Sequence, residues 1–83
     1  MASKLFYTAS VEKDLRRIDR QTAKRIVTKL EKAFAEEAQP GVPLKGDFQG
    51  LFKYRAGDYR VIYTQIKEGI LVLRIAHRKE SYR

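Results

Sequence analysis

Basic residues crowd one short stretch of the chain, residues 44–63, which reads LKGDFQGLFKYRAGDYRVIY. Turn residues at positions 57–58, between runs of strand-forming residues, predict a β-hairpin. With a two-residue turn there, Arg55 pairs with Arg60, and Lys53 falls on the same face of the hairpin. Like charges placed opposite each other destabilise a sheet. We therefore expect this face to bind a polyanion.

A second tight turn, at residues 68–69, extends the argument to the next strand. Counting back from it, Ile62 meets Ile75. By the same count Arg60 meets His77, so the only histidine of the chain joins the basic cluster. The construction depends on both turn lengths, because a one-residue slip moves side chains to the opposite face.

This cluster has the residue types needed to cleave an RNA phosphodiester with the ribose 2′-OH as nucleophile. The reaction needs a base, cations for the developing phosphate charge, and a proton for the leaving 5′-oxygen. Histidine can shuttle protons, arginine offers a fork to phosphate oxygens, and lysine supplies a charge or a base. Tyr82 in the basic tail could hold an unstacked base, and the scattered acidic residues show no metal-ligand spacing.

Each of these residues also has an ordinary structural interpretation. Lys53 is typical of a strand lysine whose stem packs on the sheet. Arg55 and Arg60 could each pair with Asp58, and His77 could be a polar residue at a strand end. Taken singly, each structural interpretation is favoured, whereas a combined cluster without a carboxylate on its face favours function.

The elements that must position the cluster follow from hydrophobic periodicity and turn signals. Ser10 is the expected N-cap of the first helix and Asp19 that of the second. The two helices are expected to form an antiparallel hairpin, because their connection is short. The expected order is strand 4–8, helices 10–18 and 19–38, loop 42–49, and strands 51–56, 59–67 and 70–77. The fold class is therefore α+β, β-α-α-β-β-β, with the helical hairpin packed on an antiparallel sheet.

Length and composition limit the classes of protein to consider. The chain has 83 residues, of which 43% are hydrophobic and 34% charged, as expected for one globular domain over residues 1–83. Cysteine is absent, and no apolar run is long enough for a membrane helix or a secretory signal, which favours a cytoplasmic location. The net charge of +8 suggests nucleic acid, the ribosome, an acidic protein or an anionic surface as partner.

The hairpin, the ending IAHRKESY at residues 75–82 and the order of elements together resemble RelE-type toxins of the RelE/ParE superfamily. The resemblance covers essentially the whole chain. It implies a toxin of a type II toxin–antitoxin pair that enters the ribosomal A site and cuts mRNA without a metal or other cofactor. It also implies partners: the ribosome, mRNA and a small acidic RelB-like antitoxin, with no membrane.

The resemblance also implies roles for individual residues. Lys53 and Arg55 match the two basic residues of the family's central strand, and Arg60 matches its phosphate contact. Arg78 resembles the arginine that supports the leaving group, and Tyr82 the tyrosine that stacks on the base. Some relatives have lysine where Arg55 stands, so Arg55 is a poor candidate for the base. Further basic residues are expected to contact substrate, namely Lys45, Lys79 and Arg83.

Three readings of the sequence remain open. The first is the endoribonuclease, with His77 as one candidate for proton transfer. The second is a non-nuclease toxin like the ParE branch, which poisons DNA gyrase. The third is an RNA- or ribosome-binding module without catalysis.

Overall fold

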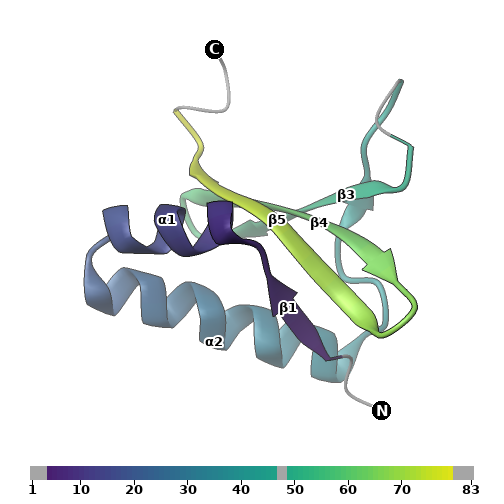
Figure 1. The fold of residues 1–83 in the computed structure, drawn as a ribbon, viewed down its shortest axis with the longest axis horizontal. Coiled ribbons are helices and arrows are strands. Elements are labelled where there is room, and N and C mark those ends of the chain that lie inside the picture. The colour runs from purple at the N-terminus through teal and green to yellow at the C-terminus, as the bar shows by residue number, and fades with distance from the viewer. Residues whose placement is uncertain (1–3, 47–48, 80–83) are drawn as a thin grey trace.

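Two helices pack on one face of a five-stranded sheet and leave the other face without a helix (Figure 1). The computed structural model describes residues 4–46 and 49–79. The elements are β1 (Leu5–Tyr7), α1 (Ala9–Arg17), α2 (Arg20–Glu36), β2 (Val42–Pro43), β3 (Leu51–Ala56), β4 (Tyr59–Ile66) and β5 (Gly69–His77). The predicted α+β class and the helical hairpin are confirmed.

The helices begin where side-chain oxygens satisfy their first free N–H groups. The α1 cap is Thr8, whose hydroxyl accepts from the N–H of Val11 at 3.2 Å, so the prediction of Ser10 was wrong by two residues. Thr8 is the N-cap because it lies directly after β1, where the chain still has the extended conformation of an N-cap residue. Asp19 caps α2, as predicted, by accepting from the N–H of Thr22 at 3.0 Å.

The sheet has the strand order β1-β5-β4-β3-β2 and is mixed. The expected all-antiparallel sheet is wrong at its first strand, because β1 pairs parallel with β5. The residues expected to form only a loop include β2, whose Val42 pairs with Lys53 of β3. The predicted pairing of β3 with β4 is confirmed: Arg55 lies opposite Arg60, and Lys53 lies opposite Ile62.

The pairing of β4 with β5 differs from the prediction by two residues beside the turn and by one residue beyond a bulge. The turn occupies residues 67–68, and Ile66 pairs with Gly69, where a turn at 68–69 was expected. A β-bulge between Ile62 and Tyr63 then shifts the register. As a result His77 lies opposite Tyr59, and the partner of Arg60 is Ala76.

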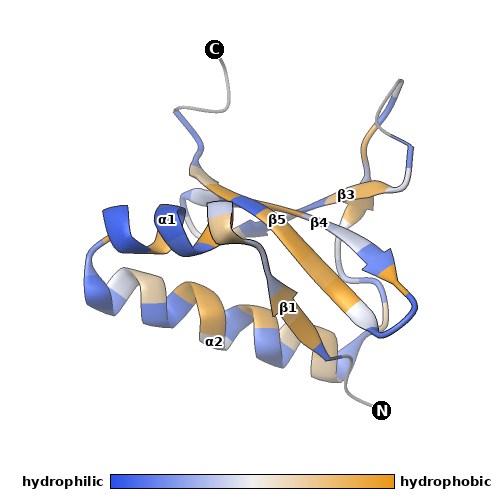
Figure 2. Ribbon diagram, in the orientation of Figure 1, coloured by the Kyte–Doolittle hydropathy of each residue, from blue (hydrophilic) through white to orange (hydrophobic). Residues whose placement is uncertain are grey.

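The hydrophobic core lies between the sheet and the helices. Ile26, Leu30 and Phe34 of α2 are buried against Val61 and Tyr63 of β4, among others. The hydrophobic colouring of Figure 2 runs along β1 and β5, while much of α1 is hydrophilic. Alternate residues of β4, such as Arg60 and Ile62, must point to the face without helices. Within the described residues, no helix combines the length and hydropathy needed to cross a membrane.

Candidate functional site

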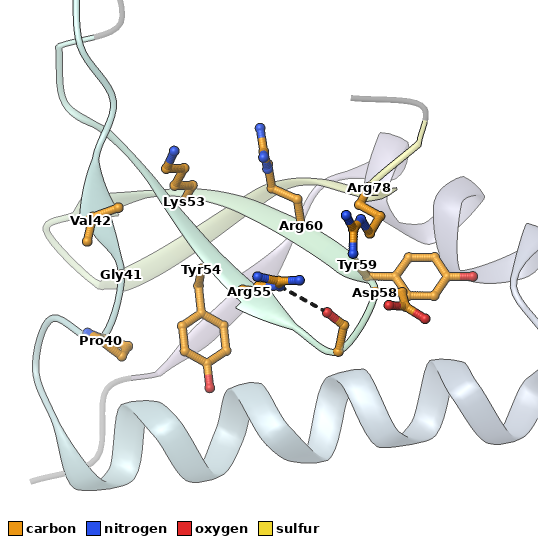
Figure 3. Close-up of a pocket in the computed structure, with 11 residues that line it drawn as sticks. Pro40, Gly41, Val42, Lys53, Tyr54, Arg55, Asp58, Tyr59, Arg60 and Arg78 are labelled. Atoms are coloured by element: carbon orange, nitrogen blue, oxygen red, sulfur yellow. Dashed lines mark hydrogen bonds between the residues drawn. The ribbon is translucent and has the colours of Figure 1, made fainter. Parts of the chain in front are cut away.

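A concave basic site lies beside the β3–β4 hairpin and has a volume of about 480 Å³. Four cations from three segments line it: Lys53 and Arg55 of β3, Arg60 of β4, and Arg78, which directly follows β5. Lys53 and Arg60 rise on the side of the sheet away from α2 (Figure 3). The structure thus brings together four of the six residues that the sequence analysis put forward as catalytic.

The tight hairpin turn positions two of these cations through its carbonyl groups. Gly57 has a φ of 64°, a conformation that glycine adopts without strain. Its carbonyl accepts from Nε of Arg55 at 3.4 Å, the dashed line of Figure 3. The carbonyl of Asp58 accepts from the backbone N–H of Arg78 at 2.8 Å. The turn therefore determines where the segment after β5 enters the site.

The opposite wall of the site depends on a buried tyrosine. The hydroxyl of Tyr63 donates to Oε1 of Gln39 at 2.6 Å and accepts from the N–H of Gly41 at 2.9 Å. A Cβ at position 41 would come within 2.5 Å of the carbonyl oxygen of Lys53, so only glycine fits there. These contacts hold the segment of Pro40, Gly41 and Val42 against β3, where it lines the basic site.

His77 does not join the basic cluster, which corrects the prediction. The shifted register puts His77 on the helix side of the sheet with Tyr59, and the two rings meet edge to face, 5.2 Å between centroids. His77 lines a separate small cavity of about 90 Å³ together with Asp14 and Arg17 of α1. The cause is the bulge, which a count from turn to turn does not include.

The other predicted contacts lie apart from the basic site or outside the described residues. Lys45 and Lys79 are described and exposed, and neither lines the basic site. Tyr82 and Arg83 lie outside the described residues, so their roles stay predictions.

Two residues of the site were missed by the sequence analysis. Asp58 lines it, and its backbone carbonyl accepts from the N–H of Arg78. Tyr59 lines it as well and forms a wall shared with the cavity of His77. The sequence did contain a signal for both residues: Asp58 and Tyr59 are in or next to the predicted turn, and residues at the end of a hairpin lie close to both of its strands. Arg74 was also overlooked: the bulge pairs it with Ile62, in one cross-strand row with Lys53.

Titration in this region is altered at Tyr54 and Tyr63. Burial, and then the negative charges of Glu36 and Glu37, raise the pKa of Tyr54 above its ordinary value. Burial raises the pKa of Tyr63, while the hydrogen bond from Gly41 acts in the opposite direction.

Within residues 4–46 and 49–79, no three histidine, cysteine or acidic side chains lie close enough together to hold a metal ion. The four cations that line the basic site give it a positive charge suited to phosphate.

The chain matches a known family along nearly its whole length. The family model described as "ParE toxin of type II toxin-antitoxin system, parDE" matches residues 5–82. The chain is also 35% identical over 80 residues to toxin RelE of Mycobacterium tuberculosis, a match that covers 92% of this chain and 81% of the relative. This chain belongs to the RelE/ParE superfamily of type II toxins.

Solved structures agree with membership of the RelE/ParE superfamily. The RelBE2 toxin–antitoxin complex of M. tuberculosis contains a chain that is 25% identical, with a TM-score of 0.82 over 94% of this chain and 100% of that one. The RelE–RelB complex of Pyrococcus horikoshii gives 26% identity and a TM-score of 0.70, over 94% and 97% of the two chains. A mutant of Escherichia coli toxin RelE in the free state shares the fold, with 21% identity, a TM-score of 0.74, and coverage of 99% and 90%.

Proposed function

We propose that this RelE/ParE-type toxin is an endoribonuclease that cuts mRNA in the ribosomal A site. The observation that supports the proposal most strongly is the convergence of Lys53, Arg55, Arg60 and Arg78 on one concave site. Such a site complements a phosphodiester whose charge increases during reaction. The 35% identity to toxin RelE supports RNA as the target, while the ParE family model that matches residues 5–82 keeps a gyrase-directed toxin as the alternative.

The proposed reaction is an attack of the ribose 2′-oxygen on the adjacent phosphorus, with departure of the 5′-oxygen. It leaves a 2′,3′-cyclic phosphate and a 5′-OH. Arg55 and Arg60 contact the phosphate oxygens, and Arg78 supports the leaving oxygen. Among the four cations, Lys53 is the one that can take the 2′-OH proton as a base, because arginine does not deprotonate in proteins. Solvent water then protonates the leaving 5′-oxygen. The proposed step uses no metal, and Tyr82 is proposed to stack on the substrate base.

The test compares two charge-removing variants of the site with two matched variants elsewhere. Lys53→Gln and Arg60→Gln remove site cations, while Lys24→Gln and Arg16→Gln remove exposed cations from α2 and α1 that do not line the site. We expect each site variant to lower the rate of mRNA cleavage on programmed ribosomes by about a hundredfold. The two helix variants should cleave at close to the wild-type rate.

The products separate this proposal from its alternatives. Primer extension on translated mRNA should find cuts within codons, and these should disappear with Arg60→Gln. DNA breaks and an SOS response without mRNA cuts would instead assign the chain to a gyrase-poisoning activity. Ribosome binding without a cleaved product would identify a non-catalytic binding module.

We also propose that an acidic antitoxin is the cognate partner of this chain. The solved relatives include RelB–RelE complexes, and the net charge of +8 favours an acidic partner. Co-expression with the protein of the neighbouring reading frame should relieve growth arrest. Persistent arrest, with no complex recovered, would contradict this pairing.

A further inference from the structure

The ring of His77 is held in a position from which it can order the chain around Arg78. Its ring packs edge to face on Tyr59 and borders the cavity beside α1. The backbone N–H of Lys79 donates to Nδ1 of this ring at 3.2 Å. An Nδ1 that accepts a hydrogen bond has no proton, so the neutral ring must have its proton on Nε2.

Two successive backbone amides are therefore fixed on either side of the Arg78 side chain. The N–H of Arg78 donates to the carbonyl of Asp58 at 2.8 Å, and the next N–H, of Lys79, donates to His77. Arg78 directly follows the last residue of β5, His77. The bonds at Arg78 and Lys79 restrict the directions in which the guanidinium group can enter the basic site.

We propose that His77 is a positioning residue for Arg78, acting through the Nδ1 bond to Lys79, and that it takes no part in proton transfer. The inference rests on the proposed endoribonuclease function, because it assigns Arg78 a role at the leaving oxygen. His77 contributes by lowering the conformational freedom of a group that must be aligned in the transition state.

Three substitutions separate an Nδ1 role from an Nε2 role. His77→Asn places its amide oxygen close to the former Nδ1 and can accept from Lys79. His77→Gln places its polar end near the former Nε2, and His77→Phe keeps the ring contact with Tyr59 but has no acceptor. We expect kcat on programmed ribosomes to fall about fivefold for Phe and Gln, the worth of one hydrogen bond, and less than about twofold for Asn. KM should be unchanged in all three.

A double-mutant cycle with Arg78→Ala gives the decisive comparison. If His77 acts through Arg78, adding His77→Phe to Arg78→Ala should cause no further loss of kcat. Additive losses, or rescue by Gln in place of Asn, would overturn the proposal, since either outcome assigns the ring a direct role. Equal activity of His77→Phe and wild type would overturn it as well.

A spectroscopic measurement keeps this test separate from the proposed function. The ¹⁵N shifts of the His77 imidazole in the free protein should show a protonated Nε2 and a bare Nδ1. Amide hydrogen exchange at Lys79 should speed up about fivefold in His77→Phe and stay near wild type in His77→Asn. A ring protonated at Nδ1, or unchanged exchange in His77→Phe, overturns the positioning role. A wild-type chain that cuts no RNA would refute the nuclease alone, while these spectra would still decide the hydrogen bond.

Discussion

At the scale of a single residue, the geometry of Arg55 suits a contact to phosphate better than the role of a base. Arg55 is exposed and directly opposite Arg60, and its Nε donates to the carbonyl of Gly57. A guanidinium group held through Nε can present its two terminal nitrogens side by side, which matches two oxygens of one phosphate. Lysine at this position would keep the charge but lose that fork.

The variant Arg55→Lys should therefore cleave mRNA about tenfold more slowly than wild type, from the loss of one charge-assisted hydrogen bond. The measurement is the single-turnover rate on programmed ribosomes, with Arg16→Lys on α1 as the matched control. If residue 55 were the base, Arg55→Lys would instead cleave faster than wild type, because lysine can lose a proton and arginine cannot. An Arg55→Lys variant that is faster than wild type would therefore contradict the phosphate contact.

At the scale of the elements, α1 completes the sheet edge that the short β1 leaves open. β1 pairs with β5 only from Ile70 to Val72. Beyond that point the hydroxyl of Thr8 donates to the carbonyl of Leu73 at 3.5 Å, and Oδ2 of Asp14 accepts from the N–H of Ile75 at 3.0 Å. A helix side chain thus takes the place of the missing strand partner and fixes α1 against the end of β5 that leads to Arg78.

Replacing Asp14 should measure this link between helix and strand. Asp14→Ala leaves the N–H of buried Ile75 without its acceptor, so we expect it to lower the free energy of unfolding by about 1–3 kcal/mol. Asp14→Asn keeps an acceptor oxygen and should lose less than half as much. Urea unfolding of both variants and of Glu12→Ala, an exposed acid of the same helix, provides the measurement. Equal losses for Ala and Asn would show that charge, rather than the hydrogen bond, is responsible.

The elements also show which parts of the fold could be predicted from the sequence. The β3–β4 pairing was predictable because a local signal, the Gly57-Asp58 turn, determines the register of the strands that it joins. The β4–β5 pairing was not, because Gly69 begins the strand and a bulge absorbs an extra residue near Leu73. Nothing local in the sequence marks that residue as unpaired.

The same difference accounts for the candidate site. Lys53, Arg55 and Arg60 depend on one tight turn and were grouped correctly. His77 depends on the bulged ladder and was assigned to the wrong face. The parallel pairing of β1 joins residues far apart in the sequence, so it left no local signal, and with it the closing role of Asp14 could not be foreseen.

For the whole molecule, one buried tyrosine connects both layers to the wall of the basic site. Tyr63 is fully buried, with Phe34 of α2 edge to face at 5.0 Å and Phe52 of β3 stacked at 5.4 Å. Its hydroxyl also holds Gln39 and Gly41. Deprotonation of this hydroxyl would remove its donated hydrogen bond and place a charge in the core, so its titration is linked to global unfolding.

Burial, opposed by the hydrogen bond from Gly41, raises the pKa of Tyr63 in the folded state, whereas in the unfolded chain it lies near 10. The stability from its neutral hydroxyl is therefore fully present below pH of about 10 and is lost as the pH rises through the folded-state pKa. At pH 8, Tyr63→Phe should be less stable than wild type by about 1–2 kcal/mol, because Gly41 and Gln39 lose their partner. That difference, measured by urea unfolding, should shrink as the pH rises from about 10 through the folded-state pKa of Tyr63. Other titrating groups are common to both proteins and cancel in the difference. The control is Val61→Ala, which removes no ionisable group, so its difference from wild type in free energy of unfolding should stay constant over the same pH range. If the difference for Tyr63→Phe were equally constant, the Tyr63 hydroxyl would not titrate with unfolding.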